Sequence, residues 1–360
     1  MWLGRCSRMS APQQTRMLDP YHPQFIVPER TALVTGAGGY IGSTLASQLL
    51  ELGYRVIGYD RYFFGKDLVS DLLLHPNFEA KVGDIRDIGP EDCEGVDVVY
   101  DLASISNDPA GELCPTLTVS INSVGRSRVA KTAREAGVPR YVLASSCSVY
   151  GASSGLDLDE TSLCQPLTTY AKACLDCEHQ VIEMARPDFT VCVLRQGTVY
   201  GVSRRMRFDL VVNIMTLNAW RSGALSVTGG GDQWRPFIHV SDTAAALRAL
   251  GRADQDRVQA ETFNAVGENM KISEVAETVA AALPIDVRID HVEGNLDRRD
   301  YNVNSDKLKN TVGWVPRMTV ASGAQEVFRS LEVGHVHRCP RSETVTWYKS
   351  LISNSNVLLR

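Results

Sequence analysis

Short apolar runs alternate with longer amphipathic stretches along the chain from residue 31 onward. Runs rich in β-branched residues predict buried strands, and apolar residues at helical spacing predict helices of about ten or more residues between them. Strands are expected at 31–35, 55–59, 78–82, 97–103, 141–145 and 189–194, and helices at 43–52, 113–136 and 169–185. Because strands alternate with long helices, the pattern predicts βαβ units in an α/β fold with a doubly wound parallel sheet.

The pattern loosens after about residue 196. Helices are expected there at 208–220, 242–250 and 273–283, and strands at 234–240 and 262–266. This mixture predicts a second, smaller mixed α/β domain that folds back on the first.

Composition narrows the class of protein. The chain has 37 basic and 42 acidic residues, a net charge of −5, which argues against nucleic acid as the main partner. No apolar run approaches the ~18 residues that span a bilayer, so no membrane partner is expected. Nine scattered cysteines without a signal peptide predict reduced thiols in the cytoplasm. Cys174-x-x-Cys177 lacks a second ligand pair, so no metal site is predicted.

The strongest local motif is Thr35-Gly36-Ala37-Gly38-Gly39-Tyr40-Ile41-Gly42, between a predicted strand and a predicted helix. Glycines there allow a tight turn and close approach of a pyrophosphate to the positive end of the helix. Asp60 ends the second strand, where a carboxylate accepts hydrogen bonds from ribose hydroxyls and repels a 2′-phosphate. The motif therefore predicts a dinucleotide site for NAD, while Arg61 next to Asp60 leaves NADP open.

Two further segments fit the same pocket. Asp84-Ile85 follows the third strand, where the carboxylate could meet an adenine amino group or, equally, cap the next turn. Leu102-Ala103-Ser104 follows the fourth strand, where small residues let a dinucleotide lie close to the backbone.

The spacing of these glycines with Asp60, Asp84, the stretch Ser145-Ser146-Cys147-Ser148-Val149-Tyr150-Gly151 and Tyr170 resembles the extended short-chain dehydrogenases/reductases. Within them it is most similar to the NAD-dependent sugar-nucleotide epimerase/dehydratase group, which includes UDP-glucose 4-epimerase-like proteins. The resemblance implies a Rossmann domain for NAD(P), a smaller domain for a nucleoside-diphosphate sugar, and a homodimer formed through the helices 113–136 and 169–185.

The hydrophobic pattern and the resemblance together give the expected boundaries. Residues 1–29 are expected to be a flexible N-terminal tail, and 30–195 the NAD(P)-binding Rossmann domain, rejoined by about 235–266. Residues 196–335 are expected to bind the sugar nucleotide, and 336–360 to form a C-terminal extension.

The catalytic residues follow from the same resemblance. Ser146 matches the serine or threonine that hydrogen-bonds the reacting sugar oxygen, Tyr170 the catalytic tyrosine, and Asn122 a supporting asparagine. A phenol near a nicotinamide can exchange a proton with a sugar hydroxyl as hydride moves. Dehydratases of the group place an Asp-Glu pair where this chain has Cys147 and Ser148, which disfavours 4,6-dehydration. The acid that decarboxylases carry beside the same serine is also absent.

One position departs from the family pattern Tyr-x-x-x-Lys. The fourth residue after Tyr170 is Cys174, and Lys172 faces about 200° away around the helix. The usual lysine lowers the pKa of the tyrosine, so without it we expect Tyr170 to stay protonated near neutral pH. A protonated phenol is a usable acid for reducing a ketone and a poor base for oxidising an alcohol. Cys174 is expected to be a packing thiol, with an acid/base function as the alternative.

Arginines mark the expected sugar-nucleotide side. Arg235 matches a family arginine that contacts the diphosphate, and Arg298 and Arg299 match a second such region. Arg207, with its neighbours Arg204 and Arg205, could add positive charge at the entrance to this site or belong to a solvent-exposed turn. Thr198 stands where many relatives have an asparagine that contacts the substrate.

The sequence thus predicts an NAD(P)-dependent, epimerase-type redox enzyme acting on a nucleoside-diphosphate sugar through a transient ketone. The alternative is an NAD(P)H-dependent ketoreductase of a keto-deoxysugar nucleotide or another secondary-metabolite ketone. A third hypothesis is a non-catalytic dinucleotide-binding protein.

Overall fold

Seven parallel strands form one sheet in the computed structural model, which describes residues 30–152, 155–294 and 300–355. Their order is β11-β7-β5-β4-β1-β2-β3, so the chain starts in the middle and winds outward in both directions. The strands are β1 (Thr31–Thr35), β2 (Arg55–Asp60), β3 (Phe78–Val82), β4 (Val98–Asp101), β5 (Arg140–Ser146), β7 (Thr190–Gln196) and β11 (Glu261–Ala265). This arrangement confirms the predicted Rossmann-type α/β fold.

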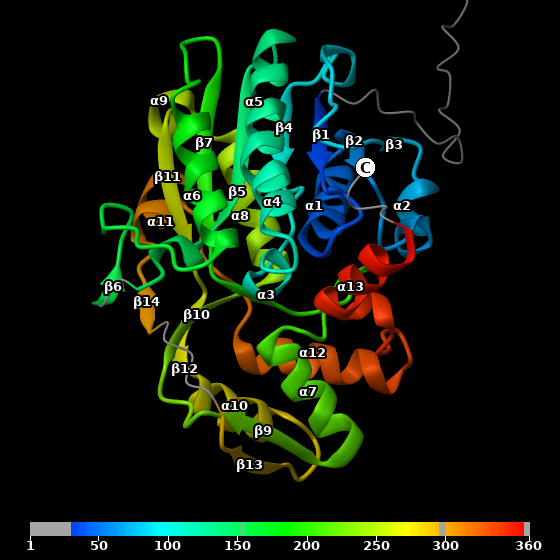
Figure 1. The fold of residues 1–360 in the computed structure, drawn as a ribbon, viewed down its shortest axis with the longest axis vertical. Coiled ribbons are helices and arrows are strands. Elements are labelled where there is room, and N and C mark those ends of the chain that lie inside the picture. The colour runs from blue at the N-terminus through cyan, green and yellow to red at the C-terminus, as the bar shows by residue number, and fades with distance from the viewer. Residues whose placement is uncertain (1–29, 153–154, 295–299, 356–360) are drawn as a thin grey trace, which may run out of the picture.

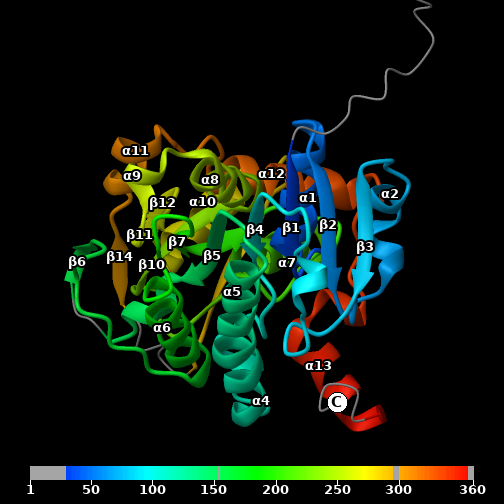
Figure 2. The ribbon, with the colours of Figure 1, turned by 90° about the horizontal axis from the view of Figure 1, so that it is seen from above.

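Helices cover both faces of the sheet (Figure 2). On one face α1 (Tyr40–Glu51) packs against α8 (Val240–Arg252), and on the other lie α5 (Arg126–Glu135) and α6 (Thr169–Ile182). Each pair buries its own apolar cluster against the strands. Burial on both faces explains why these strands are continuous apolar runs rather than alternating ones.

The helix predicted at 113–136 is divided in three. It consists of α4 (Pro115–Val119), a π-helical stretch η3 (Ser120–Gly125) and α5. The first residue of α4 is Pro115. Proline is tolerated there because an N–H in the first turn of a helix has no intrahelical partner. Single π-turns inside helices are frequent at functional sites, and this one contains Asn122.

A smaller group of elements lies below the carboxyl ends of the strands and is called here the small lobe (Figure 1). It comprises α7 (Val211–Ser222), β9 (Ala224–Thr228), α10 (Ile272–Ala282), β13 (Arg288–Val292) and α12 (Val320–Glu332), with a core of its own. A three-stranded sheet of β8 (Thr198–Tyr200), β10 (Trp234–His239) and β12 (Glu268–Lys271) connects it to the main sheet.

Short elements complete the fold. These are α2 (Ser70–Leu73), α3 (Asp108–Gly111), β6 (Gly155–Leu158) paired with β14 (Tyr301–Val303), α9 (Gln255–Val258), α11 (Asp306–Val312), α13 (Thr344–Ser355) and the 3-10 turns η1 (Lys66–Val69), η2 (Pro90–Asp92), η4 (Cys147–Tyr150) and η5 (Pro340–Ser342). The helix α13 packs beside α3, so the C-terminal segment reaches the crevice between the sheet and the small lobe.

Within residues 30–152, 155–294 and 300–355, no helix is long and apolar enough to cross a bilayer. The same ranges contain no cluster of three or more His, Cys, Asp or Glu residues suited to hold a metal ion.

Candidate active site

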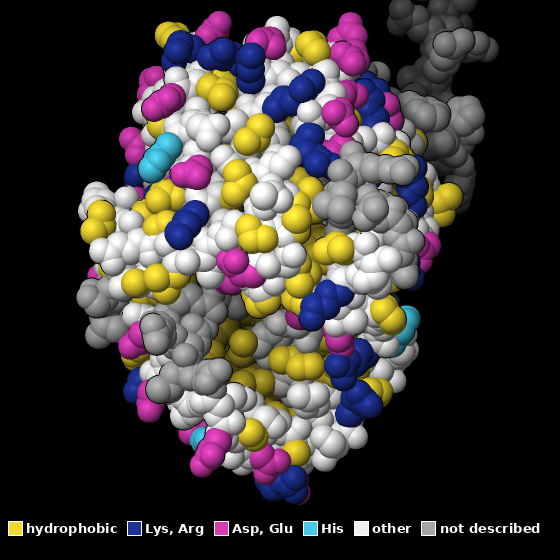
Figure 3. Space-filling view, in the orientation of Figure 1, with side chains coloured by type: hydrophobic (Ala, Val, Ile, Leu, Met, Phe, Trp, Pro, Cys, Tyr) yellow, Lys and Arg dark blue, Asp and Glu magenta, His cyan; other side chains and the backbone are white. Residues whose placement is uncertain are grey.

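A cavity of about 650 Å³ opens between the carboxyl ends of the sheet strands and the small lobe. Figure 3 shows this face of the molecule hollowed between its two parts, with hydrophobic side chains in the hollow. Parallel α/β sheets bind ligands at this edge, where the strand order reverses, and β1 and β4 lie there side by side. The glycine turn, the segments after β2, β3 and β4, and Tyr170 all line the cavity.

Glycine is required at two positions of the turn between β1 and α1. Gly36 has φ +71°, and a Cβ on it would lie 2.9 Å from the amide nitrogen of Ala103. A Cβ on Gly42 would lie 2.1 Å from the carbonyl oxygen of Gly36. Gly39 caps α1 without a side-chain hydrogen bond, and no acid lies in the first turn. The N–H groups that begin α1 therefore suit an anionic ligand.

Asp60 is held by the same turn. Its carboxylate accepts hydrogen bonds from the N–H of Gly38 at 2.9 Å and of Tyr62 at 2.7 Å. Burial raises the pKa of Asp60, and these backbone donors oppose that effect. Gly38 thus orients the carboxylate, and Gly38 itself is not among the residues that line the cavity.

Arg61 points to the neighbouring carboxylate. Its Nη1 lies 2.8 Å from Asp84 Oδ2, and Arg86 binds the same carboxylate from the other side. Burial raises the pKa of Asp84, but the hydrogen bonds from Arg86 and Arg61 outweigh it and lower that pKa to about 2. Arg61 and Arg86 thus share one carboxylate, which holds the Arg61 guanidinium beside Asp84.

Two side chains shape the segment after β4. Thr35 Oγ1 accepts hydrogen bonds from the N–H groups of Leu102 and Ala103, both at 3.1 Å. Asn122 is fully buried and binds the N–H and the carbonyl of Ile105 at 2.8 and 3.0 Å. Asn122 therefore positions the part of the cavity wall formed by Ser104 and Ile105. Its own side chain does not line the cavity.

Tyr170 lies in the first turn of α6, where Thr168 caps the helix by accepting the N–H of Ala171 at 3.1 Å. The phenol is half-buried in the cavity wall and hydrogen-bonds the hydroxyl of Ser146. Burial, then the neighbouring Cys174 and Asp108, raises the pKa of Tyr170 well above its usual value. The phenol is therefore protonated throughout the neutral pH range.

Cys174 lies one helical turn behind Tyr170 and does not line the cavity. Its thiol is 1% exposed and hydrogen-bonds Tyr170, and burial raises its pKa to about 12. The thiol is accordingly neutral at pH 7. Cys147 is also buried with a raised pKa, while the N–H of Ser148 donates to Ser146 Oγ at 3.1 Å.

Three predicted substrate residues line the far side of the cavity: Thr198, Arg207 and Arg235. Arg207 forms an ion pair with Asp209 at 2.6 Å. Arg235 comes from β10, and its guanidinium lies 5.9 Å from the centre of the Tyr301 ring. Arg298 and Arg299 lie outside the described residues.

Sequence reasoning did not single out three residues at the cavity. Asp108 begins α3 near Tyr170, Tyr348 lies on α13, and Arg205 was noted only as a neighbour of Arg207. No motif surrounds Asp108 or Tyr348 in the sequence, because distant segments bring them to the site. The two successive arginines at 204 and 205 were the one available signal.

A model of the NAD dependent epimerase/dehydratase family matches residues 32–265. The chain belongs to this family. Among curated relatives, UDP-glucuronic acid decarboxylase 6 of Arabidopsis thaliana is 29% identical over 309 residues, covering 83% of this chain and 88% of the relative. UDP-glucuronic acid decarboxylase 5 of the same plant is 29% identical over 347 residues, covering 91% and 99%.

Solved structures of similar fold include MoeE5 in complex with UDP-glucose and NAD, with a TM-score of 0.73 and 25% identity. The UDP-glucose 4-epimerase of Thermotoga maritima with UDP-glucose has a TM-score of 0.75 and 23% identity. Each covers 85% of this chain, and 100% of each solved chain is matched. Membership of this NAD-dependent family confirms the predicted resemblance and NAD as coenzyme. The expected homodimer and cytoplasmic location stay predictions.

Proposed function

We propose that this family member oxidises a hydroxyl of a nucleoside-diphosphate sugar to a transient ketone and then reduces that ketone on its other face, as a 4-epimerase does. One observation carries the proposal. The hydrogen-bonded pair of Tyr170 and Ser146 lines the same cavity as the glycine turn before α1. MoeE5 and the Thermotoga maritima epimerase, which bind UDP-glucose, have the same fold.

Different residues would bind the coenzyme, bind the substrate and transfer the proton. The N–H groups that begin α1 would hold the coenzyme diphosphate, and Asp60 the adenosine ribose. NAD, when bound, accepts and returns the hydride. Ser146 would hydrogen-bond the reacting sugar oxygen and Tyr170 would exchange its proton. Arg235 would bind the substrate diphosphate through its guanidinium fork.

The residues around Ser146 favour epimerisation over elimination. Cys147 and Ser148 carry no carboxylate, so the acid and base that remove water from a sugar are absent there. The Arabidopsis relatives are named decarboxylases. In this cavity the carboxylate that acts on the pKa of Tyr170 is Asp108, on the separate helix α3. Asp108 would accept the proton of the reacting sugar hydroxyl, because the phenol of Tyr170 is already protonated.

A ketoreductase is the second candidate, and the protonation of Tyr170 favours it. A phenol with a strongly raised pKa beside a neutral Cys174 is a proton donor at neutral pH. Donating that proton to a ketone oxygen while hydride arrives is the reductive half of the same reaction.

Incubation of the purified protein with a panel of UDP-, dTDP-, GDP- and CDP-sugars distinguishes these functions. An epimerase converts one sugar to its 4-epimer with bound NAD and no net change in absorbance at the wavelength of NADH. A ketoreductase consumes one NAD(P)H per keto-sugar reduced. If no nucleotide sugar or keto-sugar is converted while NAD binds, the non-catalytic hypothesis replaces both.

Introducing the family lysine with Cys174→Lys should raise the rate of alcohol oxidation at pH 7. An ammonium about 5 Å from the phenol contributes roughly 3 kcal/mol at an effective dielectric of about 20, on the order of two pK units. Since a cation lowers the pKa of Tyr170, the acidic limb of the pH–rate profile for oxidation, where the phenol loses its proton, should move to lower pH. Cys174→Ser adds no charge and should leave the profile in place. A fall in rate with both variants would assign the thiol a function of its own.

A further inference from the structure

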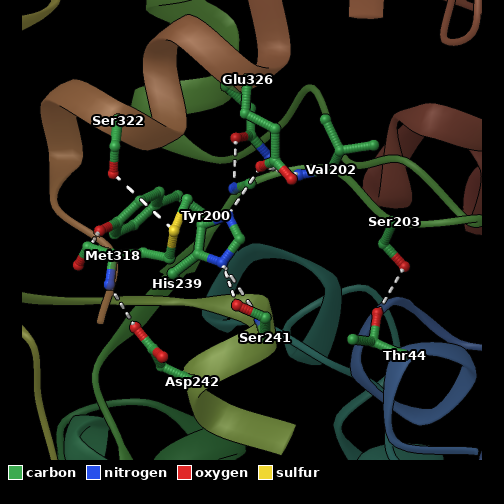
Figure 4. A network of polar contacts seen from close by, with 12 residues as sticks. Thr44, Tyr200, Val202, Ser203, His239, Ser241, Asp242, Met318, Ser322 and Glu326 are labelled. Carbon is green, nitrogen blue, oxygen red and sulfur yellow. Dashed lines mark hydrogen bonds and ion pairs between the residues drawn. The ribbon is translucent and has the colours of Figure 1, made fainter. Parts of the chain in front are cut away.

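The segment after β8 crosses from the small lobe to the beginning of α1. The hydroxyl of Tyr40 donates to the carbonyl of Gly201 at 2.6 Å, and Ser203 Oγ donates to the carbonyl of Tyr40 at 2.6 Å. Figure 4 shows the same segment bound on its other side, where the N–H of Val202 donates to Glu326 of α12 at 3.1 Å. The segment is thus fixed to α1 and to the small lobe at once.

Arg205 is the residue that this segment delivers to the cavity wall. It is 2% exposed, its guanidinium stacks on Phe64 at 3.7 Å, and its Nη2 donates to Thr344 Oγ1 at 2.9 Å. Its Nε is buried with no hydrogen-bond partner. Among the described residues, Arg205 forms no ion pair.

The neighbouring charges do not compensate Arg205. The carboxylate of Asp209 accepts hydrogen bonds from Nε and Nη2 of Arg207, at 3.2 and 2.6 Å. The charge of the same carboxylate also favours the charged form of Arg205, so two guanidinium groups share it. Burial, and then repulsion from Arg207, lowers the pKa of Arg205 to about 10. A buried cation without a partner is costly, and it is retained where an anion completes the site.

We propose that Arg205 binds the diphosphate of the NAD coenzyme, opposite the N–H groups that begin α1. This inference rests on the proposed function for the placement of the coenzyme. The anchor points of Arg205 are on the coenzyme side, because Tyr40 begins α1 and Phe64 follows β2, which ends in Asp60. Arg235, the residue expected at the substrate diphosphate, instead comes from β10.

The C-terminal helix α13 holds Arg205 in this place. Thr344 accepts the hydrogen bond from Arg205. In addition, Tyr348 stacks near Phe64 with ring centres 5.6 Å apart, and Trp347 Nε1 donates to the carbonyl of Phe63 at 2.9 Å. Arg341, just before the helix, donates to the carbonyl of Phe64 at 2.9 Å. Coenzyme binding would therefore join the sheet, the small lobe and α13 through one guanidinium.

The test is calorimetric titration of the Arg205→Met variant with NAD, ADP-ribose and adenosine. Methionine keeps an apolar stem against Phe64 and removes the charge. Loss of a charge-assisted contact should weaken NAD and ADP-ribose roughly tenfold to a hundredfold and leave adenosine, which lacks a diphosphate, unchanged. The melting temperature without ligand should stay the same or rise, because an uncompensated buried cation is removed.

Arg204→Gln is the matched control. Arg204 is adjacent in sequence, is paired with Asp71 and does not line the cavity, so its loss should leave the NAD affinity unchanged. Arg205→Lys, which retains a charge but not the planar fork, should bind NAD with intermediate affinity and serves if the methionine variant does not fold.

Each other outcome overturns the inference. Unchanged NAD affinity in Arg205→Met shows that the guanidinium does not contact the coenzyme, and a loss of UDP affinity alone assigns it to the substrate diphosphate. A lower melting temperature together with an equal loss of affinity for NAD, ADP-ribose and adenosine shows that Arg205 has a structural role only. Wild-type protein that binds no NAD contradicts the proposed function itself, whereas wild-type binding with an unaffected variant contradicts only the role of Arg205.

Discussion

We expect Tyr170→Phe to lower kcat about 10²- to 10⁴-fold on the nucleotide sugar that the enzyme converts, the range that a positioned general acid–base supplies. The phenylalanine keeps the ring and removes the hydroxyl that hydrogen-bonds Ser146 at the cavity wall. Since no residue that we place on the coenzyme diphosphate or ribose changes, the Kd for NAD should stay within about threefold. Steady-state kinetics and NAD titration on the same preparation measure the two quantities.

Tyr59→Phe provides the matched control. Tyr59 also lines the cavity, but its hydroxyl donates to the carbonyl of Asp84 at 3.1 Å, at the end of the site expected to hold adenosine. Its loss should change kcat little. Equal turnover by wild-type protein and Tyr170→Phe would remove the phenol from the mechanism and direct attention to Asp108.

The second large effect is expected on stability, from Glu178→Ala. Glu178 and Arg195 form an ion pair at 2.7 Å with the carboxylate side chain 1% exposed, and the hydroxyl of Ser145 donates to the same carboxylate. Removing one partner leaves a buried guanidinium without its counter-charge, which costs about 3–5 kcal/mol of the free energy of unfolding. Urea denaturation followed by circular dichroism measures the loss.

The ion pair joins α6, which carries Tyr170, to β7 and, through Ser145, to β5, which ends in Ser146. The double variant Glu178→Leu with Arg195→Met replaces both charges by apolar groups of similar size. It should recover most of the lost stability, because no unpaired charge remains. A double variant as unstable as Glu178→Ala would mean that packing, rather than the unpaired charge, causes the loss.

Several helices and strands differ from their predicted bounds for physical reasons. The helix expected from residue 43 begins at Tyr40, because the glycine turn itself contributes its first N–H groups. The helix predicted at 113–136 has helical spacing throughout, yet the π-turn at Asn122 depends on hydrogen bonds to Ile105, 17 residues away. Strands of the small lobe such as β9 and β13 are short and partly exposed, so no continuous apolar run marks them.

The sequence by itself determined the doubly wound sheet, the glycine turn, the acid at the end of the second strand, and the missing lysine at position 174, while Ser146 and Tyr170 as site residues stay predictions from the family resemblance. These are local features: strand and helix periods, backbone conformations that only glycine adopts without strain, and residues at fixed spacing within one element. Only the tertiary structure decided that Arg61 pairs with Asp84, that Asn122 supports the backbone, and that Arg205 meets α13 at the cavity. Such contacts join segments up to 139 residues apart, and burial and the charges nearby exist only once the chain has folded.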